Sequence, residues 1–278
     1  MIIRLLVSIP LLILFGFAIS LQFLHHLSLF IVIYVISIIS TVEYNRIILK
    51  TLKNPYEYKK YLGPLLYLFN SGLFIISYLL FKSNRKLFHN FFIIYTLAVI
   101  IYAVFILVVR RCGLRNIFYF ISGFFYTGLI PLGIVYTGVL ERGNLYLYLL
   151  FLIVWINDAS ALYIGSKFGK IKGVVSYSPN KSLEGYIGST IVTLIFTLLF
   201  KVLVFRNSCF SALEIVIIAL VLSGAGHAGD ILESALKRKA GIKDSSSLFP
   251  GLGGMLDVFD SVYASVPFYL LFIKIFCF

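Results

Sequence analysis

The sequence predicts an all-α, polytopic integral membrane protein with about nine transmembrane helices and a cytoplasmic N-terminus. Of its 278 residues, 60% are hydrophobic and 13% are charged, and the mean hydropathy is +1.00. An ordinary soluble domain has about a quarter charged residues, so this composition excludes a soluble enzyme of this length. Long charge-free windows are the second observation, because one helical span needs about 20 apolar residues. These windows cover residues 5–42, 61–81, 87–109 and 116–140.

The apolar segments predict the helices in chain order. The first window has room for two spans, and it is too long for a cleaved signal peptide. The weakest helix is 212–233, because Glu214 and Asp230 bound a charge-free run shorter than a usual span. We still expect it to cross, with both carboxylates at its boundaries or facing the protein interior. The predicted helices lie near residues 5–24, 28–42, 64–82, 90–109, 117–139, 144–165, 186–205, 212–233 and 257–276.

The basic residues predict the orientation. Nine crossings put alternate loops on opposite sides, and 17 of the 24 Lys and Arg residues then fall on one side and 7 on the other. Because basic residues gather in cytoplasmic loops, we expect the N-terminus inside and the C-terminus outside. The net charge of +13 has the same explanation, and we expect no nucleic-acid partner.

The acidic residues divide the chain into two parts. Residues 1–150 contain only Glu43, Glu57 and Glu141, all in predicted loops, whereas residues 151–278 contain the other eight acids. Several of these eight lie within or beside apolar segments, where a carboxylate costs roughly 2.5–3.5 kcal/mol. We therefore expect the first part to be a scaffold of helices and the second to be the catalytic region.

Some familiar site patterns are missing from the sequence. The three cysteines, Cys112, Cys209 and Cys277, show no CxxC spacing, so the sequence indicates neither a zinc site nor a disulfide framework. The chain contains no GxxxxGK[ST] loop and no GxGxxG fingerprint, so it supports neither standard nucleotide-binding fold.

Two stretches that are predicted to face the cytoplasm, 157–188 and 229–261, combine glycine, lysine, serine and carboxylates. Lysines and the backbone N–H groups of glycine turns bind phosphate oxygens. Carboxylates hold Mg²⁺, which bridges phosphates during phosphoryl or nucleotidyl transfer. Two acidic pairs have the i, i+3 spacing of one helix face, namely Asp230 with Glu233 and Asp257 with Asp260. The pattern predicts carboxylates that close around one or two cations.

The second stretch resembles the signature of the phosphatidate cytidylyltransferases, also called CDP-diacylglycerol synthases. That signature runs Ser-x-x-Lys-Arg, four residues, Lys-Asp, a short spacer, Pro-Gly-His-Gly-Gly, two residues and Asp-Arg-x-Asp. This chain departs from it at Leu252, where the family usually has His, and at Val258, where it usually has Arg. The matching residues are Ser234, Lys237, Arg238, Lys243, Asp244, Pro250, Gly251, Gly253, Gly254, Asp257 and Asp260.

The first stretch is similar to the upstream block of the same family. Ala159-Ser160 replaces the family's Thr-Gly, Leu162 replaces its Tyr, and Ser166 replaces its Arg, for which the neighbouring Lys167 offers a positive charge. The matching residues are Asp158, Gly165, Phe168, Gly169, Lys170, Ser178, Pro179, Lys181, Ser182, Glu184 and Gly185.

The resemblance implies transfer of a cytidylyl group from CTP to phosphatidate, giving CDP-diacylglycerol and pyrophosphate for membrane phospholipid synthesis. It also implies Mg²⁺, with room for a second cation, and a homodimer in the bilayer of the cell inner membrane with its active site facing the cytoplasm. The metal is expected on Asp230, Asp257 and Asp260, and Lys243 and Asp244 complete the catalytic set. Positioning of the nucleotide and its triphosphate is expected from Lys167, Ser178, Lys181, Glu184, Lys237, Arg238, Gly253 and Gly254.

Simpler interpretations of single residues stay open. Asp257 and Asp260 would also suit the positive end of a helix dipole, and Asp230 could be the buried partner of a lysine such as Lys243. The basic run 237–239 could be a topology anchor that touches anionic lipid head groups.

Other functions also stay open. The nearer alternative is another CTP-dependent lipid or polyprenol phosphotransferase or kinase. The more distant one is a cation-coupled transporter. A transporter should show inverted repeats with acids in both halves, whereas this chain has its membrane-depth acids in one half.

Overall fold

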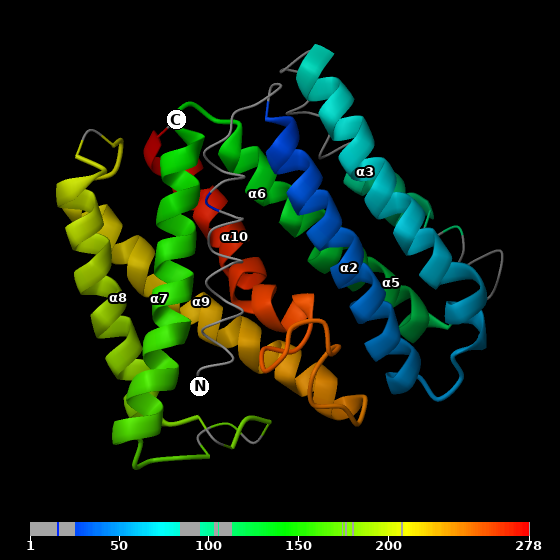
Figure 1. The fold of residues 1–278 in the computed structure, drawn as a ribbon. Helices are drawn as coiled ribbons and strands as arrows, with labels where there is room; N and C mark the ends of the chain where they lie inside the picture. The colour runs from blue at the N-terminus through cyan, green and yellow to red at the C-terminus, as the bar shows by residue number, and fades with distance from the viewer. Residues whose placement is uncertain are drawn as a thin grey trace. The chain divides into compact units, whose positions relative to one another are not determined.

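The computed structural model describes residues 16, 26–83, 95–102, 105, 113–173, 175, 177–179, 181–206 and 208–277. Every regular element in these residues is a helix (Figure 1), which confirms the all-α class. Seven helical segments among them are long and apolar enough to cross a membrane. The predicted helices near 5–24 and 90–109 lie largely outside the described residues, so seven of the nine predicted spans have a counterpart here.

The chain forms two compact units. The first comprises Met1–Tyr136 and Lys239–Leu256, and the second comprises Thr137–Arg238 and Asp257–Phe278. This boundary differs from the predicted division at residue 150. The predicted division concerns which part is catalytic, and it stays a prediction.

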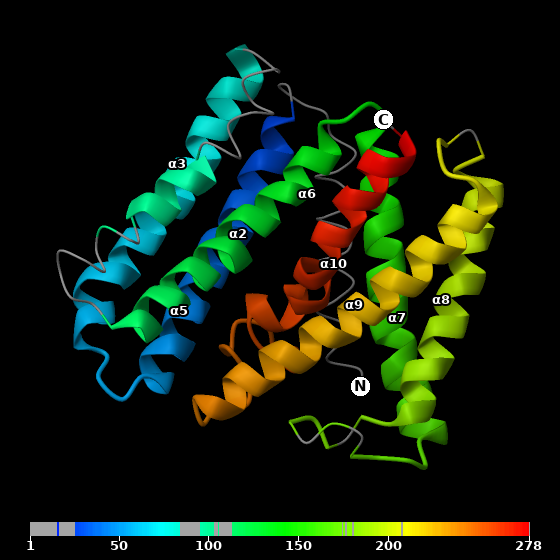
Figure 2. The same cartoon turned by 180° about the vertical axis from the view of Figure 1, so that it is seen from behind.

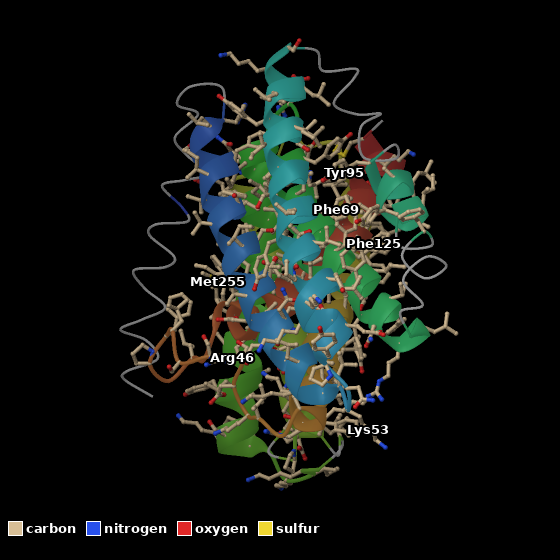
Figure 3. The ribbon with its side chains drawn as sticks, turned by 90° about the vertical axis from the view of Figure 1, so that its right-hand side faces the viewer. Arg46, Lys53, Phe69, Tyr95, Phe125 and Met255 are labelled. Carbon is tan, nitrogen blue, oxygen red and sulfur yellow. A yellow bond between two sulfur atoms is a disulfide. The ribbon has the colours of Figure 1, made fainter. Side chains whose placement is uncertain are left out.

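The first unit is built from helices joined by buried polar contacts. The amide of Asn70 donates to the hydroxyls of Thr41 (2.9 Å) and Thr127 (3.0 Å). Tyr95 donates to the carbonyl of Phe69 at 2.7 Å, and both are labelled in Figure 3. Such interhelical hydrogen bonds hold membrane helices together. The elements are α2 (Leu27–Thr51), η1 (Tyr58–Leu62), α3 (Gly63–Ser83), α5 (Leu114–Phe124), η2 (Phe125–Leu129) and most of α6 (Ile130–Gly138).

The second unit is a bundle of four long helices. Figures 1 and 2 show α7 and α8 side by side in opposite directions, with α9 crossing them obliquely and α10 next to α9. α9 is long enough to span, which supports the weakest of the predicted crossings. The helices are α7 (Gly143–Phe168), α8 (Leu183–Leu203), α9 (Ala212–Lys239) and α10 (Met255–Cys277).

Local sequence signals explain how these helices begin and how closely they pack. α8 begins after Ser182, whose hydroxyl accepts the N–H of Gly185 at 3.2 Å, as an N-cap serine does. Gly229 lets α9 approach α10, because a Cβ atom there would lie 2.7 Å from the carbonyl oxygen of Asp260. Gly229 directly precedes Asp230 in the sequence, so the close contact of the two helices is next to a predicted site residue.

The structure corrects the predicted position of Glu43. The sequence predicts a helix near 28–42 with Glu43 in a loop, but α2 continues to Thr51 and Glu43 is a buried residue inside it. The helix continues because Ile47 and Ile48 extend its buried apolar face beyond the charge. Glu57, also predicted in a loop, lies in the helical turn that leads into η1.

The structure also corrects the expectation about cysteines. Cys209, between α8 and α9, forms a disulfide with Cys277, the last residue of α10. The pairing depends on where two chain segments meet in the second unit, and a separation of 68 residues leaves no spacing pattern in the sequence.

Candidate active site

An ion pair joins the two motif stretches in the second unit. Lys181 lies just before the N-terminus of α8, and its ammonium group pairs with the carboxylate of Asp230 on α9. The hydroxyl of Ser234, one turn later on α9, donates to the other oxygen of Asp230 at 3.2 Å. Both partners of the ion pair keep about a third or less of their side chains exposed, so the pair lies at a half-buried, accessible position.

A second link connects α7 with α10. The hydroxyl of Ser261 donates to Asp158 at 3.3 Å, and the backbone N–H of Ser261 donates to the carboxylate of Asp260 at 2.5 Å. Asp260 is buried, whereas Asp158 is half-buried. The first residue of the upstream motif therefore contacts the residue that directly follows the last acid of the downstream motif.

Lys237 lies between two carboxylates near the end of α9. Its ammonium nitrogen is 2.5 Å from the carboxylate of Glu233, one turn earlier, and it also pairs with Asp257 on α10. Lys237 and Glu233 are both buried. A buried lysine at this position neutralises part of the charge on two motif acids, which a simple topology anchor would not do.

The site contains more negative than positive charge. Asp158, Asp230 and Glu233 lie close to Asp260 within the second unit. Two lysines, Lys181 and Lys237, oppose these acids. Because Coulomb interactions strengthen in a low-dielectric interior, the excess carboxylates favour binding of a cation. We call these acids the carboxylate cluster: Asp158, Asp230, Glu233, Asp257 and Asp260.

The donor set of the cluster suits a hard divalent cation. In the part of the chain that the structure describes, no three His, Cys, Asp or Glu side chains converge as a preformed metal site. Lysines engage Asp230 and Asp257 instead. Buried Glu233 receives no hydrogen bond from a neutral donor among the described residues, and its partner is the ammonium group of Lys237. Carboxylate oxygens are the ligands that Mg²⁺ prefers. The carboxylates of the cluster therefore fit a metal ion that either replaces the lysines as their partner or binds beside them.

Three other predicted site residues of the second unit make local contacts. Lys167, exposed on the last turn of α7, lies 2.6 Å from the hydroxyl of Tyr163. Glu184, in the first turn of α8, accepts the N–H of Ile171 at 3.1 Å and so holds the preceding loop. Ser178 is a half-buried residue of that loop. Their predicted roles in nucleotide binding are untested by these contacts and stay predictions.

The remaining predicted residues lie at or after the end of α9. Arg238 is exposed on the last turn of α9. The other four predicted residues belong to the first unit. Lys243 and Asp244 are exposed, whereas Gly253 and Gly254 are buried. The structure therefore groups Asp230, Asp257 and Asp260 in one unit and the glycine loop in the other.

Backbone hydrogen bonds close the glycine turn without help from a side chain at position 252. The N–H of Phe249 donates to the carbonyl of Gly253 at 2.8 Å, and the N–H of Leu252 donates to the carbonyl of Phe249 at 3.0 Å. Gly251 and Gly253 both have positive φ angles, which favour glycine. The fold of the turn therefore tolerates Leu252 in place of the family's His.

A buried polar cluster was missed by sequence reasoning. The side-chain amide nitrogen of Asn157 lies 3.3 Å from Nε2 of His227, and the hydroxyl of Ser189 lies 3.1 Å from the same nitrogen. The ring of Tyr186 meets that imidazole edge to face. One signal could have pointed to this cluster, because Ser189, Thr193 and Thr197 recur every fourth residue of α8 and are all buried. Asp158 matched the upstream motif and Glu233 formed an acidic pair with Asp230, but neither was included in the predicted metal or catalytic set.

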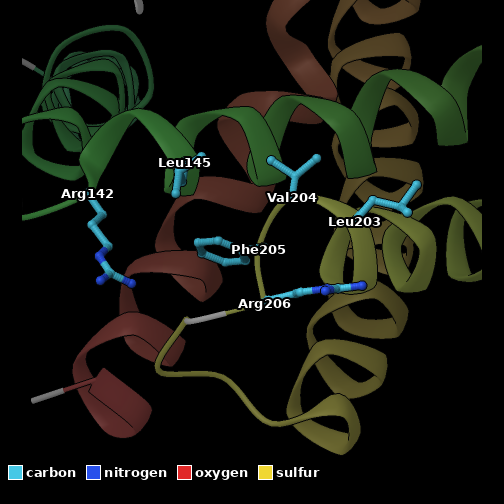
Figure 4. A pocket seen from close by; sticks show the side chains of 6 residues that line it. All are labelled: Arg142, Leu145, Leu203, Val204, Phe205 and Arg206. Atoms are coloured by element: carbon cyan, nitrogen blue, oxygen red, sulfur yellow. The ribbon is translucent and has the colours of Figure 1, made fainter.

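A pocket of about 270 Å³ lies elsewhere in the second unit (Figure 4). Arg142 directly precedes α7, and residues 203–206 comprise the last residue of α8 and the three that follow it. The motif residues occupy the opposite ends of these two helices, so this pocket is separate from the carboxylate cluster. Its lining consists of Arg142, Leu145, Leu203, Val204, Phe205 and Arg206.

The fold and the site together define a polytopic membrane protein with lysines and carboxylates clustered at helix ends. The model of the cytidylyltransferase family matches residues 2–276, so the chain belongs to that family. Among curated proteins, it is 32% identical to the phosphatidate cytidylyltransferase of Bacillus subtilis over 183 residues, which are 63% of this chain and 67% of that protein.

Two further relatives with the same name match shorter segments. The protein of Staphylococcus saprophyticus is 40% identical over 127 residues, which are 46% of this chain and 48% of the relative. The protein of Haemophilus influenzae is 40% identical over 141 residues, which are 49% of this chain and 48% of the relative. The matched segments therefore span about half the length of these two relatives.

Proposed function

We propose that this chain is a phosphatidate cytidylyltransferase, which converts CTP and phosphatidate to CDP-diacylglycerol and pyrophosphate. Membership of the cytidylyltransferase family and the names of the curated relatives support this function. The observation that carries the proposal is the ion pair between Lys181 and Asp230, because it brings the two motif stretches to one place.

The proposed reaction needs charge control more than proton transfer. A phosphate oxygen of phosphatidate forms a bond to the α-phosphorus of CTP, and the bond between the α-phosphorus and the bridging oxygen breaks. Pyrophosphate then leaves with that oxygen. The attacking phosphate monoester is already anionic near pH 7, so no strong general base is required. The main obstacle is the mutual repulsion of two polyanions.

The residues of the site supply complementary charges for this reaction. Lys181 would hold the triphosphate and stabilise the developing charge on pyrophosphate. Lys243 of the glycine loop stays a predicted catalytic residue. Asp230, Asp257 and Asp260 would hold Mg²⁺, which when bound neutralises charge on the phosphates. Lys237 would keep Asp257 oriented through their ion pair. The lipid tails would stay in the bilayer while the head group meets CTP.

One assay tests the proposed activity. Purified protein with CTP, dioleoyl phosphatidate and Mg²⁺ should release pyrophosphate, and removal of the divalent cation by a chelator should stop the release until Mg²⁺ is added back. Diacylglycerol and a polyprenol serve as control acceptors. Turnover with a control acceptor but not with phosphatidate would favour the kinase alternative and contradict the proposal.

The proposal includes an active site that faces the cytoplasm, because CTP is made there. Ser166 and Ser247 are exposed residues of the two motif stretches, and each can be changed to cysteine in a chain without the native cysteines. An impermeant thiol reagent should label both only after the inner face of the membrane is opened. Labelling of either residue from outside in intact cells would contradict the orientation. The homodimer implied by the family resemblance is testable by the mass of the detergent-solubilised protein.

A further inference from the structure

Glu43 is a buried acid of the first unit that holds both ends of the glycine loop. From one end of the loop, the hydroxyls of Ser245 and Ser246 donate to its carboxylate at 2.9 and 2.6 Å. From the other end, the backbone N–H groups of Met255 and Leu256 donate to it at 2.9 and 2.8 Å. All five residues belong to the first unit. One carboxylate on α2 thus closes a loop that is about 200 residues away in the sequence.

The contact also fixes the start of α10. Met255, which Figure 3 shows beside α2, is the first residue of α10, and Leu256 is the second. The first N–H groups of a helix have no acceptor within the helix, and a negative charge near them is favourable. Glu43 supplies both the acceptor and the charge.

Gly254 shows how closely the loop packs against this carboxylate. A Cβ atom at this position would overlap the carboxylate of Glu43 and the hydroxyl of Ser245. Glycine is therefore required by the contact with Glu43, and that requirement is separate from any direct role of Gly254 in binding phosphate.

We infer that Glu43 is a positioning residue for cytidylyl transfer, which orders the glycine loop and the first turn of α10. Lys243 and Asp244 directly precede the two serines that Glu43 binds, and Asp257 directly follows Leu256. Reacting groups must be held in place to lower the barrier, and a glycine-rich loop is flexible without an anchor. The inference rests on the proposed function, because it assigns the purpose of this ordering to that reaction.

Glu43→Gln tests the inference, because the amide keeps the shape but turns one acceptor oxygen into a donor nitrogen. We expect kcat to fall at least ten-fold and the KM for CTP to rise, while the KM for phosphatidate stays within two-fold. Glu43→Asp, which keeps the charge, should recover part of the loss. Glu57→Gln is the matched control, since Glu57 bonds Asn116 at 3.2 Å rather than the glycine loop, and it should stay within two-fold of the parent.

Hydrogen exchange provides a readout independent of turnover. In Glu43→Gln, the amides of 245–256 should exchange faster, whereas those of α7 and α8 should be unchanged. Unchanged kinetics, an equal rise of both KM values, or a uniform gain of exchange over all helices would overturn the positioning role. If the parent protein shows no turnover with CTP and phosphatidate, the proposed function fails, and the exchange data alone then decide whether Glu43 orders the loop.

Discussion

Buried carboxylates have different kinds of partner in the two units. Glu43 of the first unit receives four hydrogen bonds from neutral donors, two hydroxyls and two backbone N–H groups. Glu233 of the second unit receives no hydrogen bond from a neutral donor among the described residues and pairs with Lys237. Its neighbours Asp257 and Asp260 are also acidic, so charge is concentrated around it.

The difference separates a structural use of a carboxylate from a ligand-binding one. Four donors satisfy one carboxylate and leave little capacity for a metal or a substrate. Five carboxylates against two lysines leave negative charge that a cation can neutralise. An acid that persists at membrane depth without neutral donors therefore points to function, as expected for ionisable groups inside a membrane.

The largest effect should come from removing charge in the carboxylate cluster. Asp257→Asn keeps the shape of the side chain and loses the charge that a hard cation requires. We expect turnover to fall roughly 100-fold or more, while membrane insertion is unchanged. Glu214→Gln is the control, because Glu214 caps the opposite end of α9 by accepting the N–H of Ser211 at 2.7 Å. Near-normal turnover of Asp257→Asn would contradict the metal assignment.

A second variant tests whether Lys237 supports the buried acids. Lys237→Ala leaves Glu233 and Asp257 without their shared cation, and breaking a buried ion pair from one side costs about 3–5 kcal/mol. We expect a lower melting temperature in detergent and reduced turnover as a consequence. Lys239→Ala, an exposed neighbour, should leave both unchanged.

The double variant with Glu233→Gln sharpens this test. It removes the charge of Glu233, one of the two carboxylates that Lys237→Ala leaves without a cation, so it should recover part of the stability lost in the single variant. An unchanged melting temperature in the single variant would show that the lysine is dispensable to the site.

A smaller and more selective effect is expected at Lys181. Lys181→Ala should raise the KM for CTP about ten-fold, which corresponds to about 1.4 kcal/mol, and leave the KM for phosphatidate within two-fold. The reason is that Lys181 is assigned to the triphosphate. Lys172→Ala, an exposed residue of the same loop, is the control. Equal KM values for CTP in parent and variant would restrict Lys181 to a structural role.

The smallest effect on turnover should come from the disulfide. Cys209 lies between α8 and α9 and Cys277 ends α10, whereas the motif acids of α9 and α10 lie toward the end of the former and at the start of the latter, so Cys209→Ser should keep turnover within two-fold. Stability should fall by about 2 kcal/mol, because the open chain gains conformational freedom when unfolded. Before reduction, neither cysteine should react with a thiol reagent. Labelling of both in the native protein without reductant would argue against the bond.

Sequence patterns predicted the features that depend on local chemistry. The long apolar windows predicted seven helices that the structure describes, including the short-looking 212–233 segment that lies within α9. The count of basic residues by side predicted that both stretches face the same side, and the ion pair between Lys181 and Asp230 brings one residue of each stretch together. The sequence left the partner of Asp230 open, with Lys243 as one option, because partner choice depends on how helices pack.

Glu43 was misplaced for a related physical reason. A charged residue after an apolar run marks the end of a helix when water is its only partner. Here its partners are Ser245, Ser246 and the start of α10, which lie far along the chain. The sequence therefore predicted that Glu43 is a loop residue of a region with only a structural role.

The sequence by itself determined the class of the protein and the types of residue available for chemistry. Its hydropathy requires helices that satisfy their own backbone hydrogen bonds in lipid, and its motifs contain the lysines and carboxylates of a phosphate site. The tertiary structure decided which lysine meets which carboxylate, which acid is satisfied by neutral donors, and which cysteines join. Those outcomes depend on contacts between segments up to about 200 residues apart, and such contacts are set by helix packing in three dimensions.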